Sequence, residues 1–301
     1  MSLRAWSELI ALSIIWGGSF LAIRTALDEI PVMSVVAHRV GWAAFALWIV
    51  ILVRGVALPK DRATIFALLG MGVLNNAIPF SLLAWGQLEV ETGLTSILNG
   101  TTAIFGVLLA AAIFADERLT WNRGLGVCLG FVGVALAIGP AQLLNFDLRS
   151  AAQGAILLAA LSYAVAGMWA KKHLAGLDPM VAAAGMLTSS ALILVPLAAF
   201  MDGATGVPRE PATIAAILYY ALISTAFAYL LYYRVLAMAG SGNVLLCTLL
   251  IPPVAIVLGA LVRGEVLTPG TFFGFAALAS GLMLIDGRVL RRGPRRRNSS
   301  A

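Results

Sequence analysis

The sequence predicts an all-α integral membrane protein whose ten transmembrane helices form two five-helix repeats of inverted topology. Three observations support this prediction: the composition, the number of long apolar segments, and a phrase that occurs twice. Of the 301 residues, 61% are hydrophobic and 11% are charged, whereas soluble domains contain roughly 45–50% apolar and about 25% charged residues. Because one water-soluble core cannot bury so much apolar surface, we expect the chain to lie in a lipid bilayer.

Ten apolar segments are long enough to cross the hydrocarbon core, which takes about 20 residues of helix. They lie at residues 6–26, 33–53, 63–84, 93–114, 122–140, 151–171, 179–201, 212–236, 243–263 and 270–287. Lipid offers no partners to backbone N–H and C=O groups, so each segment is expected to be a helix. No small-residue cleavage site follows the first segment, which is therefore expected to remain as a transmembrane helix.

The lysines and arginines predict the orientation. With both termini in the cytoplasm, all but five of the 20 basic residues face inside; the five are Arg24, Arg39, Arg149, Arg209 and Arg263. This distribution follows the positive-inside rule and predicts a multi-pass protein of the cytoplasmic (inner) membrane. The net charge of +6 is interpreted as a topology signal, because no stripe of basic and aromatic residues indicates nucleic-acid binding.

A hydrophilic phrase occurs twice along the chain. DERLTWNRGLG at 116–126 returns as GEVLTPGTFFG at 264–274, which places Glu117 and Glu265 148 residues apart, and Pro31 and Pro179 keep this spacing. Each unit holds five helices, so the second copy enters the bilayer from the opposite face, as in many secondary transporters. We expect repeats at 1–144 and 145–288 and a basic cytoplasmic tail at 289–301. The alternative is a chance similarity between two helix ends.

Several motifs resemble those of one transporter family. IIWGGSFLAIRTAL at 14–27, the two related phrases, and STAFAYLLYYRVL at 224–236 are similar to the EamA family of the drug/metabolite transporter superfamily. The resemblance covers nearly the whole chain and implies a ten-span metabolite exporter; amino acid exporters of the YddG type are among the relatives. Asn99 matches a position in those exporters, and GTTA follows it here in place of their aromatic–proline step.

Prolines inside two predicted helices indicate interruptions. Pro252 and Pro253 lie near the middle of segment 243–263, and Pro79 lies in segment 63–84. Each proline removes a backbone donor and frees the carbonyl four residues earlier. One interpretation is a pair of broken helices that gate a central cavity. The other is a set of plain kinks.

Polar and aromatic residues inside the apolar segments are the candidate binding residues. Asn76 and Asn99 are costly in lipid unless their amides find partners, so we expect them to point into the bundle. Trp16 lies too deep for an interfacial anchor, and Trp16, Tyr163 and Tyr229 are predicted to form cavity walls. The alternative for the asparagines is hydrogen bonding between helices without any role in binding.

His38 and Arg39 are ionisable residues within segment 33–53. His38 is a candidate substrate-binding residue with a pH-dependent charge, or else a hydrogen-bonded packing residue. Arg39 must face water, a partner or the substrate, unless it extends along the helix to the membrane surface. No Asp or Glu falls at mid-membrane, so transport is expected to proceed by facilitated diffusion or exchange.

No catalytic, cofactor or metal site is predicted. The chain lacks a GxxxxGK[ST] phosphate-binding loop, and its two His and two Cys do not form a ligand set. We expect an exporter of small, mostly apolar metabolites, such as aromatic or hydrophobic amino acids, that works by alternating access. Its expected partners are a small-molecule substrate and the lipid bilayer, and its oligomeric state stays open. Alternatives are a channel-like or scaffold membrane protein, or a transporter of another metabolite or drug class.

Overall fold

The structure, a computed structural model, describes residues 2–114, 119–139, 144, 147–239 and 246–286. Within these ranges every regular element is a helix and none is a strand, which confirms the predicted all-α class for the described residues. Eight helices are long and apolar enough to cross a membrane, and two shorter apolar helices, Cys247–Arg263 and Pro269–Ile285, follow them. Glu117 of the repeated phrase and the tail 289–301 lie outside the described residues.

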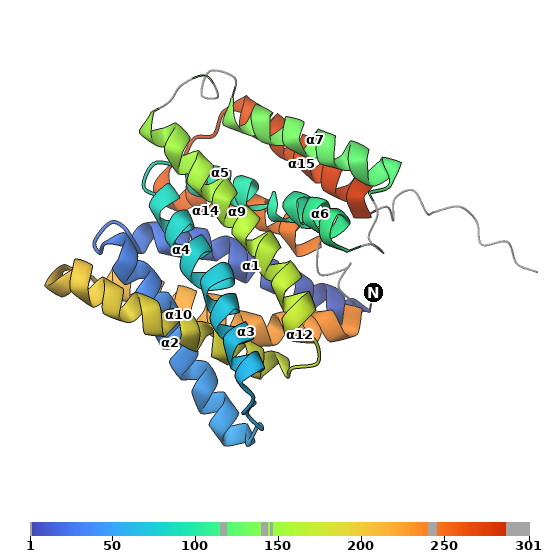
Figure 1. The fold of residues 1–301 in the computed structure, drawn as a ribbon. Helices are drawn as coiled ribbons and strands as arrows, with labels where there is room; N and C mark the ends of the chain where they lie inside the picture. Colours follow the sequence, from blue (N-terminus) through green and yellow to red (C-terminus); the bar gives the residue numbers. More distant parts are fainter. Residues whose placement is uncertain (1, 115–118, 140–143, 145–146, 240–245, 287–301) are drawn as a thin grey trace, which may run out of the picture.

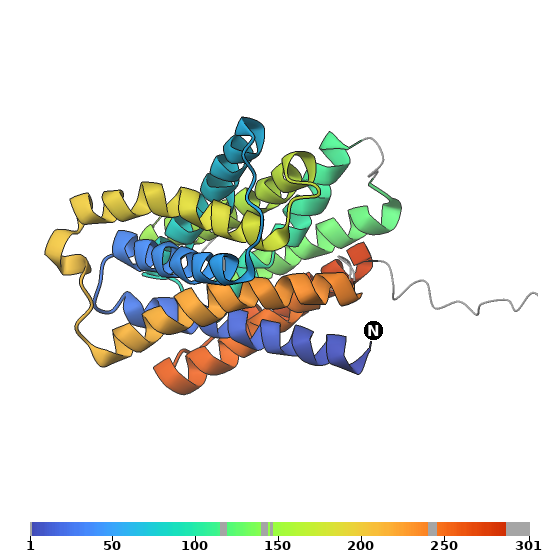
Figure 2. The same cartoon turned by 90° about the horizontal axis from the view of Figure 1, so that it is seen from below.

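The helices run back and forth between two ends of the bundle (Figures 1 and 2). In chain order they are α1 (Leu3–Ala26), α2 (Val32–Arg54), α3 (Arg62–Gly72), η1 (Val73–Ala77), α4 (Ile78–Gly86), α5 (Thr92–Asn99), α6 (Thr102–Ile113) and α7 (Trp121–Ile138). The second half holds α9 (Leu148–His173), α10 (Pro179–Met201), η2 (Gly203–Gly206), α11 (Pro211–Leu218), η3 (Tyr219–Phe227), α12 (Ala228–Ala239), α14 (Leu246–Arg263) and α15 (Pro269–Asp286). We call the end where α1 begins the N-terminal end, and the other the far end.

Short polar side chains begin several helices. The first turn of a helix leaves backbone N–H groups without partners, and an oxygen on the preceding residue can accept from them. Asp61 accepts from the backbone N of Thr64 at 2.7 Å, and Ser2, Thr120, Asp147 and Asp178 cap α1, α7, α9 and α10 in the same way. These residues therefore mark where the chain turns back.

Two membrane-crossing segments contain π-helical turns. In such a turn the backbone N–H donates to the carbonyl five residues earlier, whereas in an α-helix it donates to the carbonyl four residues earlier. In η1 the N–H of Ile78 donates to the carbonyl of Val73, because Pro79 lacks the N–H that an α-helix would use next. In η3 the N–H of Ala228 donates to the carbonyl of Ile223. The wide turn of η1 thus lies directly before Pro79, whereas that of η3 lies in a stretch without proline.

The interruption expected at Pro252 and Pro253 is absent, because α14 continues through both prolines. Two prolines remove only two backbone donors, and the remaining backbone hydrogen bonds of this helix can keep it continuous. The neighbouring helix α1 also supports it, since a Cβ on Gly17 would lie 2.6 Å from the Cβ of Val254. The expected gating role of Pro252 and Pro253 assumed a broken helix, and α14 is not broken at these residues.

A break that no proline marks separates α5 from α6 at Gly100 and Thr101. The hydroxyl of Thr101 donates to the carbonyl of Leu98 at 2.7 Å, and that of Thr102 donates to the carbonyl of Asn99 at 2.8 Å. The Thr102 hydroxyl thus donates to a carbonyl at the break, and the Thr101 hydroxyl adds a second bond to the carbonyl of Leu98, which also accepts from the backbone N–H of Thr101 at 3.1 Å.

Helices α7 and α15 pack side by side through glycines. A Cβ on Gly126 would lie 2.6 Å from the carbonyl oxygen of Gly281, and one on Gly133 would lie 2.7 Å from that of Gly274. The two helices are antiparallel, since the earlier residue of one meets the later residue of the other. Backbones can approach this closely only where no side chain intervenes.

The bounds of paired elements keep the spacing found in the sequence. Both ends of α7 lie 148 residues before those of α15, as 269 − 121 and 286 − 138 show. Adding 148 to the bounds of η1 gives 221–225, which falls inside η3. Helix α2 packs on α10, and α7 packs on α15. These three pairs of elements therefore keep a spacing of about 148 residues, and two of the pairs pack on each other.

Candidate substrate-binding site

Arg39 is the buried charge of the bundle interior. It is the eighth residue of α2, roughly 10 Å along the helix from its far-end start, and is 9% exposed. The guanidinium carbon lies 3.9 Å from the centre of the Phe80 ring, and Nε donates to the hydroxyl of Thr225 at 3.0 Å. The side chain therefore points inward across α4 and η3 and does not extend to the membrane surface.

Tyrosines and an asparagine surround this guanidinium. Tyr163 of α9 meets the Phe80 ring edge to face, with ring centres 6.4 Å apart. Asn75 donates its amide to the hydroxyl of Tyr229 at 3.2 Å. We call Arg39, Asn75, Phe80, Tyr163, Thr225 and Tyr229 the Arg39 cluster.

The two π-helical turns position members of this cluster. Asn75 lies in η1, directly before the α4 segment that carries Phe80. In η3 the hydroxyl of Thr225 donates to the carbonyl of Tyr220 at 2.7 Å while its oxygen accepts from Arg39. π-turns are rare and occur often at functional sites. Their presence in both segments that meet at Arg39 supports a functional reading of the cluster.

No carboxylate among the described residues lies within 4.0 Å of Arg39; the ion pairs there involve other arginines. The two terminal NH₂ groups of its guanidinium also have no hydrogen-bond partner in the described part of the chain. Arginine stays protonated at any physiological pH. The cluster is therefore a positively charged site walled by aromatic rings and neutral polar groups.

The structure brings some predicted site residues together and separates others. Tyr163 and Tyr229 belong to the cluster, as predicted from their depth. Trp16 donates from Nε1 to the carbonyl of Ser224, next to Thr225, at 3.2 Å, so it lies against η3. Asn76 is fully buried and donates to the hydroxyl of Ser190 on α10 at 3.1 Å. It is held by a neighbouring helix, while the adjacent Asn75 faces the cluster.

Asn99 and His38 lie apart from these contacts. Asn99 ends α5 at the break, and its buried side-chain oxygen Oδ1 has no hydrogen-bond partner among the described residues. The Nε2 atom of His38 lies 3.1 Å from the carbonyl oxygen of Gly206, in the connection after α10. This contact matches the packing interpretation of His38. The predicted site lacked four members of the cluster: Arg39, Asn75, Phe80 and Thr225. For Arg39, its charge inside an apolar segment was a signal.

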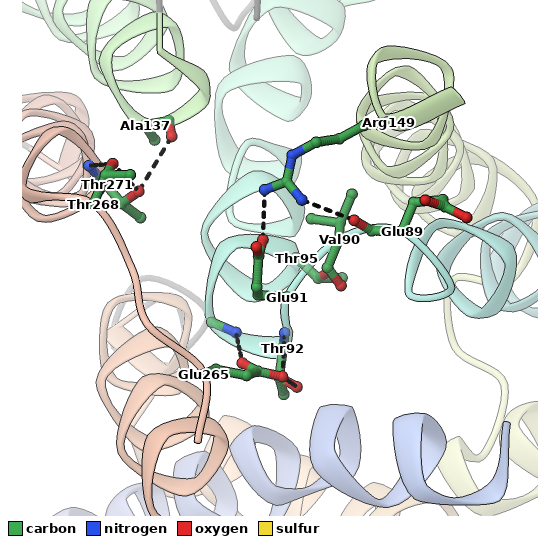
Figure 3. A network of polar contacts seen from close by, with 11 residues as sticks. Glu89, Val90, Glu91, Thr92, Thr95, Ala137, Arg149, Glu265, Thr268 and Thr271 are labelled. Carbon is green, nitrogen blue, oxygen red and sulfur yellow. Dashed lines mark hydrogen bonds and ion pairs between the residues drawn. The ribbon is translucent and has the colours of Figure 1, made fainter. Parts of the chain in front are cut away.

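A network of polar contacts joins helices at the far end, and Figure 3 shows its centre. Glu265 follows α14 and accepts from the backbone N–H of Thr92 at 3.1 Å, from that of Gly93 at 3.4 Å, and from the Thr92 hydroxyl. Arg149 at the start of α9 pairs with Glu91 at 2.6 Å and donates to the carbonyl of Glu89 at 2.9 Å. Glu265 thus ties the α14–α15 connection to the first turn of α5.

Acidic residues after α1 extend these far-end contacts. Asp28 pairs with Arg263 at 2.6 Å and with Arg24 at 2.7 Å. Burial favours a raised pKa for Asp28, but the two arginines outweigh it and hold the pKa below its ordinary value of 3.8. The Thr213 hydroxyl and backbone N–H groups at the start of α11 lower the pKa of Glu29. Both carboxylates are thus held ionised at neutral pH.

Comparisons with known proteins agree on a transporter. The sequence matches the EamA-like transporter family at residues 6–139 and again at 151–286. It is 30% identical to a "Probable terminal-alkyne amino-acid exporter" of Streptantibioticus cattleyicolor, over 97% of this chain and 96% of that protein. It is 27% identical to a "Probable amino-acid metabolite efflux pump" of Salmonella typhimurium, over 93% and 94%. A solved crystal structure shares the fold, with a TM-score of 0.70 at 15% identity over 97% of this chain and 99% of that one.

Proposed function

The chain belongs to the EamA-like transporter family, and from this premise we propose that it exports small, mostly apolar metabolites such as hydrophobic amino acids. Its relatives are named transporters, amino-acid exporters and efflux pumps, and its apolar helices point to a multi-pass membrane protein. The observation that carries the proposal is the Arg39 cluster. It offers aromatic walls for an apolar side chain beside a few polar groups, the make-up of many small-molecule sites.

We propose that the two halves are inverted repeats related by a pseudo-twofold axis. The contacts between α7 and α15 support this arrangement: Gly126 packs on Gly281, and Gly274 packs on Gly133. Since 274 − 126 and 281 − 133 both equal 148, exchange of the halves turns one contact into the other. The matched π-turns support it in the same way, because they place a wide turn from each half beside Arg39. Transporters with such repeats hold substrate between the halves and open to each side in turn.

In this proposal the far end faces outward and its network closes the outer side. The termini are cytoplasmic, as the distribution of lysine and arginine favours. The contacts of Asp28, Glu29, Glu91 and Glu265 then join helices of both halves on the outer surface. Opening toward that side would break these contacts, whereas opening toward the cytoplasm would leave them in place.

This topology predicts which positions an impermeant thiol reagent reaches. After Cys128 and Cys247 are changed to serine, single cysteines at the exposed residues Lys60 and Lys172 should react only from the cytoplasmic side. Cysteines at the exposed residues Glu89 and Val266 should react only from outside. The measurement is labelling of intact cells against inverted membrane vesicles. Reaction of Lys172 and Val266 from one same side would exclude the proposed topology.

The proposed transport activity is tested by solute counterflow. Purified protein in liposomes is loaded with unlabelled leucine, methionine or phenylalanine, and uptake of the labelled compound is followed. A carrier should show saturable exchange that is faster when the inside is loaded. Flux that rises linearly with concentration and ignores internal loading indicates a channel instead. Absence of flux for all three compounds contradicts the proposed substrate class.

A further inference from the structure

Arg39 carries a charge for which the described residues provide no countercharge. A guanidinium inside a membrane-spanning bundle is costly unless it is paired. Phe80 and Thr225 together offer one cation–π contact and one hydrogen-bond acceptor. Neither group is an anion, and each is worth less than a carboxylate partner. The positive charge and the two terminal NH₂ groups therefore remain to be satisfied by something other than these residues.

We infer that Arg39 binds the carboxylate of the transported molecule. This inference rests on the proposed transport function and narrows its substrate class to small apolar carboxylates, amino acids among them. The guanidinium matches a carboxylate because its planar N–H groups form two parallel hydrogen bonds with the two oxygens. The NH₂ groups that lack protein partners are the ones that such a pair would use.

The surroundings of the guanidinium decide which carboxylates fit. The rings of Phe80 and Tyr163 lie beside it, so the group attached to the carboxylate is expected to be apolar or aromatic. The carbonyl oxygen of Asn75 and the hydroxyl of Tyr163 are neutral groups that an α-ammonium group could use as acceptors. No second cation belongs to the cluster, so a phosphate ester, which demands more positive charge, is disfavoured.

A purely structural role for Arg39 accounts less well for these observations. A structural arginine in a protein interior is normally paired with a carboxylate or several carbonyls. Among the described residues, Arg39 makes its one hydrogen bond through Nε, and the face of its guanidinium lies on the Phe80 ring. Its hydrogen-bond partner Thr225 lies on a π-turn. The geometry thus holds the side chain by its inner nitrogen and leaves the outer two for another molecule.

The test compares ligands with and without a carboxylate on the wild-type protein and on variants of Arg39. Counterflow of labelled leucine is competed with unlabelled leucine, with 4-methylpentanoate, which keeps the carboxylate but lacks the ammonium, and with leucinamide, which lacks the carboxylate. Methionine and phenylalanine with their amides form two parallel series. Wild type should prefer leucine over leucinamide by about 10- to 100-fold, the range of one charge-assisted pair. In Arg39→Gln that preference should fall to about threefold or less, and Arg39→Lys should restore part of it.

Arg54→Gln is the matched control, because Arg54 lies on the same helix but is exposed in its last turn. It should keep the wild-type preference for leucine. Equal competition by leucine and leucinamide in wild type overturns the inference. So does a loss in Arg39→Gln that is the same for both ligands, since a structural defect weakens both alike.

A second measurement distinguishes failure of the proposed transport function from failure of this inference. If no compound gives counterflow, thermal stabilisation of the purified protein by leucine, 4-methylpentanoate and leucinamide reports binding alone. Stabilisation by the two carboxylates that is lost in Arg39→Gln supports the inference without transport. Stabilisation that is equal for leucinamide, or no stabilisation by any of the three, overturns it.

Discussion

Replacing Gly133 by leucine is expected to separate α7 from α15 and to destabilise the protein by about 3 kcal/mol or more. The reason is that the added Cβ would lie 2.5 Å from the backbone N of Leu278 and 2.7 Å from the carbonyl oxygen of Gly274. Backbone atoms cannot move aside as a flexible side chain can, so the helices must shift apart. The measurement is a melting curve in detergent, in which the midpoint should fall by roughly 6–12 °C.

Gly124→Leu is the control for this substitution. Gly124 lies on the same helix, and a Cβ there would meet nothing within 4 Å. Because leucine favours helix formation over glycine by about 1 kcal/mol, this variant should melt at the wild-type temperature or slightly above it. Equal losses of stability in Gly133→Leu and Gly124→Leu would show that Gly133 is not required for the close packing of α7 on α15.

Replacing Glu265 by alanine is expected to loosen the far end and cost about 2–4 kcal/mol of stability. Thr92 is fully buried, so removal of the carboxylate leaves its N–H and hydroxyl without an acceptor, together with the N–H of Gly93. A cysteine at the buried position Thr95 reports the opening. It should react with a thiol reagent at least about tenfold faster in Glu265→Ala, as a shift of about 1.4 kcal/mol in the opening equilibrium implies.

Glu89→Ala serves as the comparison, since the Glu89 side chain is exposed and only its backbone carbonyl takes part in the network. It should leave both the melting midpoint and the labelling of the Thr95 cysteine unchanged. Unchanged labelling in Glu265→Ala would show that the carboxylate does not hold the far end closed.

The helices were predictable because lipid imposes a strong and local constraint. A run of apolar residues about 20 long must be a helix in a bilayer, so the segment predicted at 179–201 coincides with α10, and that at 33–53 differs from α2 by one residue at each end. The starts of α3 and α10 are also fixed locally, because Asp61 and Asp178 accept hydrogen bonds from the first turns of these helices. Neither constraint depends on the tertiary structure.

The departures from regular α-helix were not equally predictable. Pro79 indicated an irregular stretch of helix near η1, because a missing donor is a local property. The wide turn in η3 and the break after Asn99 depend on side-chain bonds, those of Thr225 and Thr101, that compete with the helical pattern only in the folded bundle. At Pro252 and Pro253 the helix continues unbroken, since a helix packed against α1 can tolerate two missing donors.

The sequence predicted how deep in the membrane the candidate site residues lie better than it predicted the directions in which their side chains point. The sequence placed Tyr163, Tyr229 and Asn76 within apolar segments, but which of the neighbours Asn75 and Asn76 faces the cluster depends on a rotation of about 100° per residue. A π-turn changes this rotation, so Asn75 meets Tyr229 and Asn76 meets Ser190. For Arg39 the sequence left two directions open, along the helix to the surface or inward across it. The positions of Phe80 and Thr225 around the guanidinium distinguish them.

The inward position of Arg39 has an electrical consequence. Its guanidinium cannot lose its proton at physiological pH, and α2 is one of the helices able to cross a membrane, so a permanent positive charge resides inside the transmembrane voltage. A potential of 100 mV acts on one charge carried across the whole membrane with about 2.3 kcal/mol. Movement through a tenth of that distance therefore changes the energy by about 0.2 kcal/mol. Any conformational step that displaces Arg39 along the membrane normal will thus respond to voltage, even though no titrating carboxylate accompanies it.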